Sequence, residues 1–343
     1  MQFSILAAGR AARRTALLCA SAVLLAGSAH AADALKIGAS AISIVNSPAP
    51  LTAAKPDLFE AQGIAPEIID FRGSSPNCIN AVLSGDADLC QAGTTTGMDA
   101  IAEGAALKVV AIFARPAIEI VVSSKAVAAS GVAESAPVEQ KLGMLKGLRF
   151  SSSPPGNANY TLLTEMLKSA GLTPQDVQYQ TLTDTTAMIE SMRNDRIDAA
   201  MWSVGPLSNL LQDNTGVRWV SIGRGDVPSL AEIPYVSVFA RASWVDENPD
   251  LVKRVHAAYA ATIKRMKDDP QGASVVIREK YFPNIDPALW EDSFRQGALS
   301  FIDGVTGTEA GWNQLIALQA QSTGKDYAPA AFDKVVADVA KAK

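Results

Sequence analysis

Side chains able to act as nucleophiles or metal ligands are scarce in this sequence. Its 343 residues include three cysteines and two histidines, and the predicted leader described below removes Cys19 and His30. The remaining chain keeps Cys78, Cys90 and His256, too few for a Cys/His metal site, which needs three or four ligands. A Ser-His-Asp or Cys-His arrangement would have to use His256, whose helical surroundings favour a structural role. The sequence therefore predicts no catalytic residue, no metal and no cofactor.

Hydroxyl, glycine, asparagine and arginine side chains instead gather directly after predicted strands. In an open α/β sheet, ligands bind outside the carboxyl ends of the strands. Helix N-termini there offer unpaired N–H groups and a positive dipole end, and the guanidinium fork of arginine matches a carboxylate or a sulfonate. We therefore predict an anion-binding site built from Ser40, Asn46, Arg72, Gly73, Ser74, Thr94, Thr95, Thr96, Arg115, Ser153, Gly156, Asn157, Trp202 and Ser203.

These residue types also have interpretations that need no ligand. A hydroxyl run such as Thr94 to Thr96 can serve as an ordinary helix N-cap. Arg72 and Arg115 can be surface residues or salt-bridge partners, and Trp202 can pack in the core. Both interpretations stay open at the level of the sequence.

Cys78 and Cys90 are twelve positions apart. Disulfides persist in exported proteins, which favours a bond between them. The spacing alone does not bring the two Cα atoms within the ~7 Å that the bond requires. A disulfide and two free thiols therefore remain alternatives.

The first 31 residues have the features of a signal peptide. Three arginines between positions 10 and 14 form a basic segment, residues 16–26 are apolar, and residues 29–31 match the A-x-A cleavage pattern. The apolar run is shorter than the ~20 residues that a membrane-spanning helix needs. We predict an exported chain that begins at Ala32, resides in the periplasm and does not insert stably into the membrane.

Composition excludes several classes of protein. Hydrophobic residues make up 48% of the chain and charged residues 19%, so a core can form and a disordered or collagen-like chain is excluded. The formal net charge of −5 becomes −8 when the leader, with its arginines and no acidic residue, is removed. Such a chain lacks the basic surface that nucleic-acid binding needs, and no nucleic acid is predicted as a partner.

Strand and helix signals alternate and predict an α/β protein with two lobes, each a parallel-type sheet flanked by helices. We expect the first lobe over residues 32–122, the second over 123–235, and a return to the first over 236–343. Two crossover strands would then hinge the lobes around a ligand-binding cleft.

Several local elements follow from the same pattern. Residues 123–147, rich in Ala and Ser, are interpreted as a crossover between the lobes, and residues 235–240 as the strand that brings the chain back. A helix is expected at 50–62. The C-terminal region is expected to be helical after residue 247, with a last helix over 330–341.

Segments in a fixed order resemble the periplasmic solute-binding proteins of nitrate, sulfonate and taurine ABC importers, a family related to thiamine-pyrimidine synthase-like proteins. These segments are KIG at 36–38, AAKPDLFEAQGI at 53–64, INAVLSGDADL at 79–89, LKGLRF at 145–150, SPPGN at 153–157 and LKSAGLTP at 167–174. The resemblance implies a two-lobed type II periplasmic-binding-protein fold. One departure is VGPL at 204–207, where family members often carry an aromatic-acidic-proline-aromatic group.

The resemblance further implies a monomeric component of an ABC importer that captures a small organic anion without chemistry and delivers it to a membrane permease. The expected anion is a sulfonate or a carboxylate, aromatic ones included. Two alternatives are a thiamine-pyrimidine synthase-like enzyme and a module that presents ligand to a receptor kinase. The cysteine-rich motif of the pyrimidine synthases is missing, which argues against the enzyme, whereas the sequence does not separate sensing from import.

Overall fold

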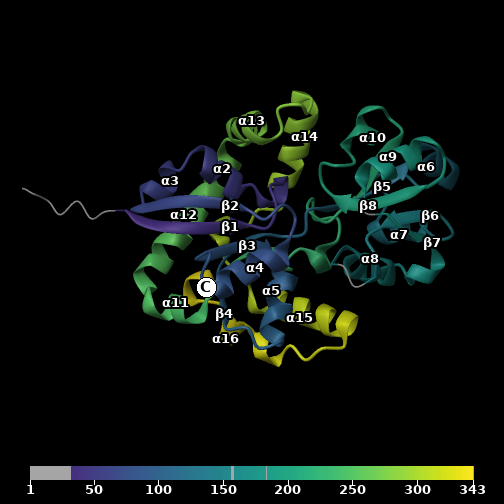
Figure 1. Cartoon of the computed structure of the whole chain (residues 1–343). Helices are drawn as coiled ribbons and strands as arrows, with labels where there is room; N and C mark the ends of the chain where they lie inside the picture. Colours follow the sequence, from purple (N-terminus) through teal and green to yellow (C-terminus); the bar gives the residue numbers. More distant parts are fainter. Residues whose placement is uncertain (1–31, 156–157, 183, 343) are drawn as a thin grey trace, which may run out of the picture.

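The structure is a computed structural model that describes residues 32–155, 158–182 and 184–342. Two lobes lie side by side, each built on a five-stranded sheet with helices packed around it (Figure 1). This arrangement confirms the predicted two-lobed α/β fold. The predicted leader, Gly156 and Asn157 lie outside the described residues.

The sheet of the first lobe has the strand order β2-β1-β3-β10-β4. β1 pairs in parallel with β2 and β3, whereas β10 runs antiparallel to β3 and β4. β3 and β4 are buried along almost their whole length, which explains their continuous apolar runs. The strands are β1 (Asp33–Ala39), β2 (Ile64–Asp70), β3 (Leu89–Gly93), β4 (Leu107–Ala114) and β10 (Val236–Arg241).

The sheet of the second lobe repeats this plan with the order β7-β6-β8-β5-β9. β6 pairs in parallel with β7 and β8, and β5 runs antiparallel to β8 and β9. The strands are β5 (Ile118–Ser123), β6 (Arg149–Ser152), β7 (Gln178–Thr181), β8 (Ala199–Ser203) and β9 (Gly216–Ser221).

Helices connect the parallel strands and cover both sheets. Lys55 and Pro56 break the helix expected at 50–62 into two, because the residue before a proline disfavours the helical conformation. The helices before β10 are α2 (Pro48–Ala54), α3 (Asp57–Glu60), α4 (Ser75–Ser84), α5 (Thr94–Ala102), α6 (Ser124–Ser130), α7 (Val138–Gly143), α8 (Ala158–Ser169), α9 (Thr185–Arg193) and α10 (Ser208–Gln212).

Two segments carry the chain between the lobes: residues 115–117 join β4 to β5, and residues 222–235 join β9 to β10. The return strand expected at 235–240 is present as β10. The first crossing differs from the expectation, because β5 belongs to the second sheet and residues 123–147 hold α6 and α7 of that lobe. The second lobe therefore begins near Ile118. β4 and β5 are both buried apolar strands, so hydrophobicity gives no sign that the sheet changes between them.

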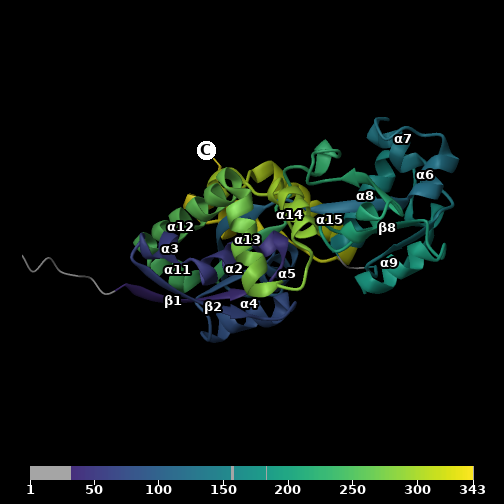
Figure 2. The same cartoon turned by 90° about the horizontal axis from the view of Figure 1, so that it is seen from above.

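The C-terminal region is largely helical and packs on the first lobe, with α14 and α15 on the side that faces the second lobe (Figure 2). Its helices are α11 (Ala242–Glu247), α12 (Pro249–Asp268), α13 (Pro270–Tyr281), α14 (Pro287–Ala298), α15 (Glu309–Thr323) and α16 (Phe332–Val335). Within the described ranges, no helix is both long enough and apolar enough to cross a membrane.

The prediction of a single helix over residues 330–341 is wrong. That segment contains only the short α16 and 3-10 turns, and Val336 makes a parallel bridge to Val109 of β4. β4 is an edge strand with free backbone groups, and pairing with them satisfies the segment's own N–H and C=O groups. This tertiary pairing outweighs the helix propensity of its alanines and lysines.

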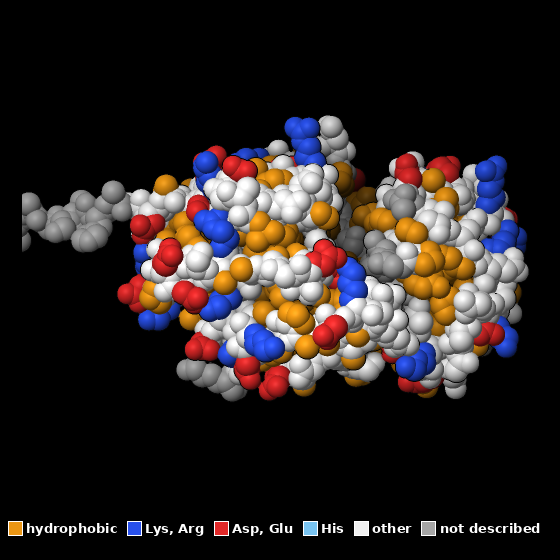
Figure 3. Space-filling model, turned by 60° about the horizontal axis from the view of Figure 1, so that its bottom comes forward, with side chains coloured by type: hydrophobic (Ala, Val, Ile, Leu, Met, Phe, Trp, Pro, Cys, Tyr) orange, Lys and Arg blue, Asp and Glu red, His pale blue; other side chains and the backbone are white. Residues whose placement is uncertain are grey.

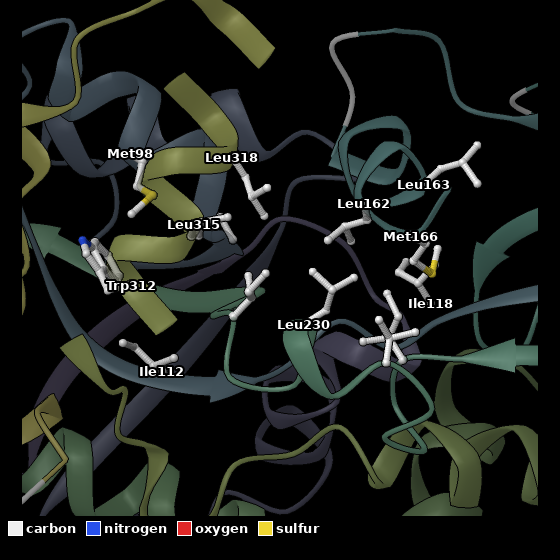
Figure 4. Packing of buried hydrophobic residues seen from close by; sticks show 14 of the residues in the cluster. Met98, Ile112, Ile118, Leu162, Leu163, Met166, Leu230, Trp312, Leu315 and Leu318 are labelled. Atoms are coloured by element: carbon white, nitrogen blue, oxygen red, sulfur yellow. The ribbon is translucent and has the colours of Figure 1, made fainter. Parts of the chain in front are cut away.

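Buried side chains of the two lobes meet in one cluster at their junction (Figure 4). Leu162 on α8 comes from the second lobe, and Leu315 and Leu318 on α15 come from the first. Beside them, the Thr161 hydroxyl lies 3.2 Å from the Ser322 hydroxyl. The lobes are therefore packed against each other on the α8–α15 side.

A disulfide joins Cys78 on α4 to Cys90 on β3, with the two Cα atoms 5.7 Å apart. Both cysteines are fully buried. Gly38 of β1 packs against the bond, since a Cβ at that position would lie 2.8 Å from Cys78 Sγ. The cross-link thus fastens a covering helix to the middle of the first sheet.

Replacing both cysteines, as Cys78→Ala with Cys90→Ala, is expected to lower the free energy of unfolding by about 3 kcal/mol, because the unfolded chain regains the freedom of the closed loop. Urea unfolding followed by tryptophan fluorescence measures the change. Dithiothreitol should lower the free energy of unfolding of the wild type to about the value of the variant, and it should leave the value of the variant unchanged. A variant as stable as the oxidised wild type would contradict a stabilising role for the bond.

Candidate ligand-binding cleft

The carboxyl ends of β1 and β8, one strand from each lobe, lead into loops that border a hollow between the lobes. Figure 3 shows the surface of the two lobes with a groove between them. The hollow contains a cavity of about 530 Å³. Its lining comes from three places: residues 42–45 after β1, residues 203–206 at the end of β8 with Asn209 and Gln212 beyond them, and residues of the α13–α14 region between 282 and 293. Both lobes therefore build the cavity.

Local backbone conformation allows the two lobes to approach at this cavity. Gly205 has φ +114°, a conformation that side chains with a Cβ rarely adopt, and a Cβ there would lie 3.0 Å from Ile44 Cδ1 of the other lobe. Ser208 on α10 and Ser293 on α14 bring their hydroxyl oxygens to 2.9 Å. These contacts fix the loop after β8 against the C-terminal helices.

The cavity lining is mainly apolar and nearly uncharged. Among the described lining residues, one side chain is charged, that of Asp286. Its Oδ1 accepts a hydrogen bond from the Leu289 N–H at the start of α14. The polar remainder consists of hydroxyl and amide groups. The apolar lining residues are Ile42, Ile44, Val45, Val204, Pro206, Phe282, Ile285, Leu289 and Trp290.

The predicted residues of the first lobe gather at the carboxyl edge of its sheet. The Gly73 N–H donates to the Ser40 carbonyl, and the Ser40 N–H donates to the Gln91 carbonyl, so the ends of β1, β2 and β3 lie together. Ser74 caps α4 by accepting from the Asn77 N–H. These contacts agree with the helix-cap interpretation of Ser74 and leave its neighbourhood polar.

The threonine run forms the first turn of α5. Thr94 is buried and shares a hydrogen bond of 2.8 Å with Ser237 of β10. A Cβ on Gly93 would lie 3.8 Å from Thr96 Oγ1 and 3.9 Å from Ser75 Oγ. The first turns of α4 and α5 therefore present hydroxyl groups to the same place, while Thr95 borders a small cavity next to Pro116 in the first crossing.

Asn46 connects the β1 loop to the middle of the sheet. Its backbone carbonyl accepts a 2.7 Å hydrogen bond from Gln91 Nε2, and its Nδ2 donates to Ser43 Oγ. Gln91, which is fully buried, was not among the predicted residues. The sequence did offer a signal, namely an amide side chain within the otherwise apolar strand LCQAG. Asn46 thus positions the loop that lines the cavity.

The two predicted arginines occupy different places. Arg72 is exposed after β2 and has φ +51°. Arg115 lies in the first crossing, where its Nη2 is 3.5 Å from Glu232 of the second crossing and its buried Nε has no hydrogen-bond partner. Arg115 therefore links the two inter-lobe segments and keeps one donor available.

In the second lobe, Ser153 follows β6 and Ser203 is the last residue of the neighbouring strand β8, where it lines the cavity. Ser153 is buried, and its carbonyl accepts a hydrogen bond from the Tyr179 hydroxyl. Burial raises the pKa of Tyr179 to about 12, so this hydroxyl stays protonated at neutral pH. Trp202 packs against the small cluster around Met188, in agreement with a core role.

A buried ion pair lies where the second sheet meets α14. Glu119 on β5 is fully buried, and its Oε2 is 2.5 Å from Arg218 Nε on β9. Arg218 also reaches Asp292 of α14 at 3.7 Å, and Arg224 donates to Gln296 of α14. Burial raises the pKa of Glu119, although the positive charge of Arg218 opposes that shift. None of these residues was predicted, because each pairing joins positions far apart in the sequence.

His256 is placed away from the cavity. It lies on α12, where its Nδ1 is 3.0 Å from the Val110 carbonyl of β4. Desolvation lowers its pKa. In the described part of the chain, no group of three or more His, Cys, Asp or Glu residues is arranged to hold a metal ion.

The sequence matches the family model described as NMT1/THI5 like over residues 46–273. A search of curated protein sequences finds no significant match.

Several solved structures share the fold. The periplasmic aliphatic sulphonate binding protein SsuA from Escherichia coli has a TM-score of 0.64 at 17% identity, over 88% of this chain and 92% of that one. The alkanesulfonate-binding protein SsuA from Xanthomonas axonopodis pv. citri, bound to MOPS, has a TM-score of 0.59 at 20% identity, over 89% and 98%. The periplasmic nitrate-binding protein NrtA from Synechocystis PCC 6803 has a TM-score of 0.53 at 13% identity, over 75% and 68%.

Arg218→Met is expected to lower the free energy of unfolding by about 3–5 kcal/mol at neutral pH, because it leaves the buried Glu119 carboxylate without its partner. The variant should also raise the pKa of Glu119 further. A carboxyl with a raised pKa in the folded state stabilises the fold when protonated and loses that contribution as the pH rises through this pKa. The deficit measured by urea unfolding should therefore grow from pH 5 to pH 8.

Arg193→Met is the matched control, since Arg193 pairs with Glu190 and Asp213 at the surface. Arg193→Met should change the free energy of unfolding much less than Arg218→Met does, because solvent screens an exposed ion pair. Equal, small effects of the two substitutions would show that the Glu119–Arg218 pair does not stabilise the protein.

Proposed function

The chain belongs to the NMT1/THI5-like family, and from that premise we propose that it is the solute-binding component of an ABC importer. In this function it captures a small organic anion between its lobes, without chemistry, and delivers it to a membrane permease. The predicted leader would direct it to the periplasm, where it acts as a monomer.

The observation that carries the proposal is the cavity shared by the loops after β1 and β8. These loops belong to different lobes, and the lobes are joined through residues 115–117 and 222–235. A ligand that contacts both lobes favours the arrangement in which they are close together, because only there are all its contacts made. A permease can then distinguish the loaded protein from the empty one.

The anion preference is supported by the first turns of α4 and α5. Both helices begin at the carboxyl edge of the first sheet, and their hydroxyl groups lie around Gly93. N-terminal N–H groups and the positive end of the helix dipole favour a negative group there. Arg72 and Arg115 add positive charge near the same edge. Solved relatives with this fold are described as binding sulfonates or nitrate, and we propose a sulfonate or a carboxylate for this chain.

The proposal differs from its alternatives in what can be measured. A thiamine-pyrimidine synthase-like enzyme would convert its ligand, so chromatography of the ligand after incubation with the protein distinguishes it from a receptor that returns the ligand unchanged. A sensing module would leave uptake intact in a strain that lacks the protein, whereas an importer component would abolish it.

Native mass spectrometry of protein purified from cells, followed by a thermal-shift screen of organic sulfonates and carboxylates, tests the proposal. A ligand at about 100 times its Kd adds ~2.7 kcal/mol to the stability of the folded state. For a chain of this size, that increment raises the Tm by several degrees. A complete panel without any shift would contradict the proposed anion capture.

Arg72→Ala and Arg115→Ala locate the charged group of the ligand found in this way. Each is expected to weaken binding, measured by calorimetry, by about tenfold or more, because a hydrogen bond to a charged group contributes ~1.5–3 kcal/mol. Arg193→Ala, at the carboxyl end of α9 and outside the residues that line the cavity, should leave the affinity unchanged. If both test variants retain wild-type affinity, the charged group binds elsewhere.

A further inference from the structure

We propose that Arg218 and Asp292 form an electrostatic latch that holds the two lobes together without contacting a ligand. Arg218 lies on β9 of the second lobe, and Asp292 lies on α14, which packs on the first lobe. The described lining of the cavity includes neither residue. The latch goes beyond the proposed function, and its test needs no solute.

One face of α14 meets the second lobe, beside α10 (Figure 1). The Ser293 hydroxyl of this helix lies 2.9 Å from the Ser208 hydroxyl of α10, and Gln296 accepts a hydrogen bond of 2.8 Å from Arg224 in the second crossing. Asp292 shares this face, because positions one and four residues apart lie close together on a helix surface. The latch is therefore part of a contact between the lobes.

Glu119 fixes the position of the Arg218 guanidinium. The Glu119 side chain is fully buried on β5, and its Oε2 lies 2.5 Å from Arg218 Nε, whose side chain is 11% exposed. A guanidinium is planar and rigid, so a partner on Nε also sets the direction of the neighbouring Nη2. Arginine stays charged in proteins. The second sheet thus holds a fixed positive group at its border with α14.

One donor of this group is not used within the second lobe. Arg218 Nη2 is buried and has no hydrogen-bond partner among the described residues, and Asp292 Oδ2 lies 3.7 Å from it. Arg295 of α14 donates to the other carboxylate oxygen, Oδ1. An N–H···O hydrogen bond forms at roughly 2.7–3.2 Å, so a movement of less than about 1 Å would complete the pair. A buried donor without a partner favours that movement.

The attraction between Arg218 and Asp292 depends on how the lobes are arranged. If the second lobe moves away from α14, Glu119 stays with Arg218 on the second sheet, whereas Asp292 remains with the helix. Only the closed arrangement therefore gains from the pair. An interaction present in one of two arrangements shifts the equilibrium toward that arrangement. We expect the latch to favour closed lobes in the ligand-free protein.

Reaction of Ser208→Cys with a thiol reagent, in the absence of ligand, tests the latch. Ser208 is 1% exposed and its hydroxyl meets that of Ser293 across the lobes, so the new thiol reacts when the lobes separate and its rate follows the open population. The native cysteines form a buried disulfide and do not compete. Adding Asp292→Asn should speed the reaction about threefold or more, a factor within the range of a partly exposed ion pair.

Ser151→Cys is the matched reporter of unfolding. Ser151 lies on β6 between β7 and β8, is fully buried, and its hydroxyl has no hydrogen-bond partner in the described structure, so the substitution removes no hydrogen bond. Asp292→Asn should leave the rate at this position unchanged. Glu291→Gln removes one charge from an exposed position of the same helix and should change neither rate. Asp292→Glu keeps the carboxylate and should restore slower reaction at position 208.

Three results would overturn the latch. An unchanged rate at position 208 with Asp292→Asn would show that Glu119 alone satisfies Arg218. Faster reaction of both reporters would show that Asp292 stabilises the fold rather than the closed arrangement. Equal acceleration by Glu291→Gln would assign the effect to the charge of the helix. None of these results depends on anion binding, so failure of the latch and failure of the proposed function are observed separately.

Discussion

Each lobe of this protein depends on a strand that arrives directly from the other lobe. β5 follows β4 after three residues, and β10 follows β9 after the second crossing; both insert antiparallel into the interior of their new sheet. A strand between two partners cannot leave without breaking two hydrogen-bonded ladders. The crossings are therefore anchored at both ends, and the carboxyl edges of the two sheets are held facing each other. The cleft is a consequence of this exchange.

The cleft has two chemically different parts. The first turns of α4 and α5 collect hydroxyl and N–H groups at the edge of the first sheet. The neighbouring cavity, closed by α14, is apolar and without positive charge in its described lining. A polar group and an apolar group on one solute would each be matched by one part, and the covalent link between them would supply specificity that neither part has alone.

The sequence predicts what local patterns encode. Apolar runs and glycine stops mark most strands and helices, so the two lobes, the return strand β10 and the gathering of Ser40, Gly73 and Thr94 at strand ends were predictable. The first crossing was not, because β4 and β5 look alike in hydrophobicity. The segment 330–341 follows β4 rather than its own helix propensity. Three features were not predictable: the wall formed by α14, the Asn46–Gln91 contact and the Glu119–Arg218 pair. They join residues that are from 45 to more than 200 positions apart, and no rule of sequence spacing predicts contacts at such separations.

The order of the segments along the chain has a consequence for biosynthesis. The second lobe is one continuous stretch, so all its strands exist once residue 221 has been made. The first sheet at that moment lacks β10, the strand that bridges β3 and β4. Its two halves can join only after residues 236–241 emerge, long after β1. During synthesis from the N-terminus, the inserted lobe is therefore able to reach its native structure before the lobe that surrounds it in the sequence.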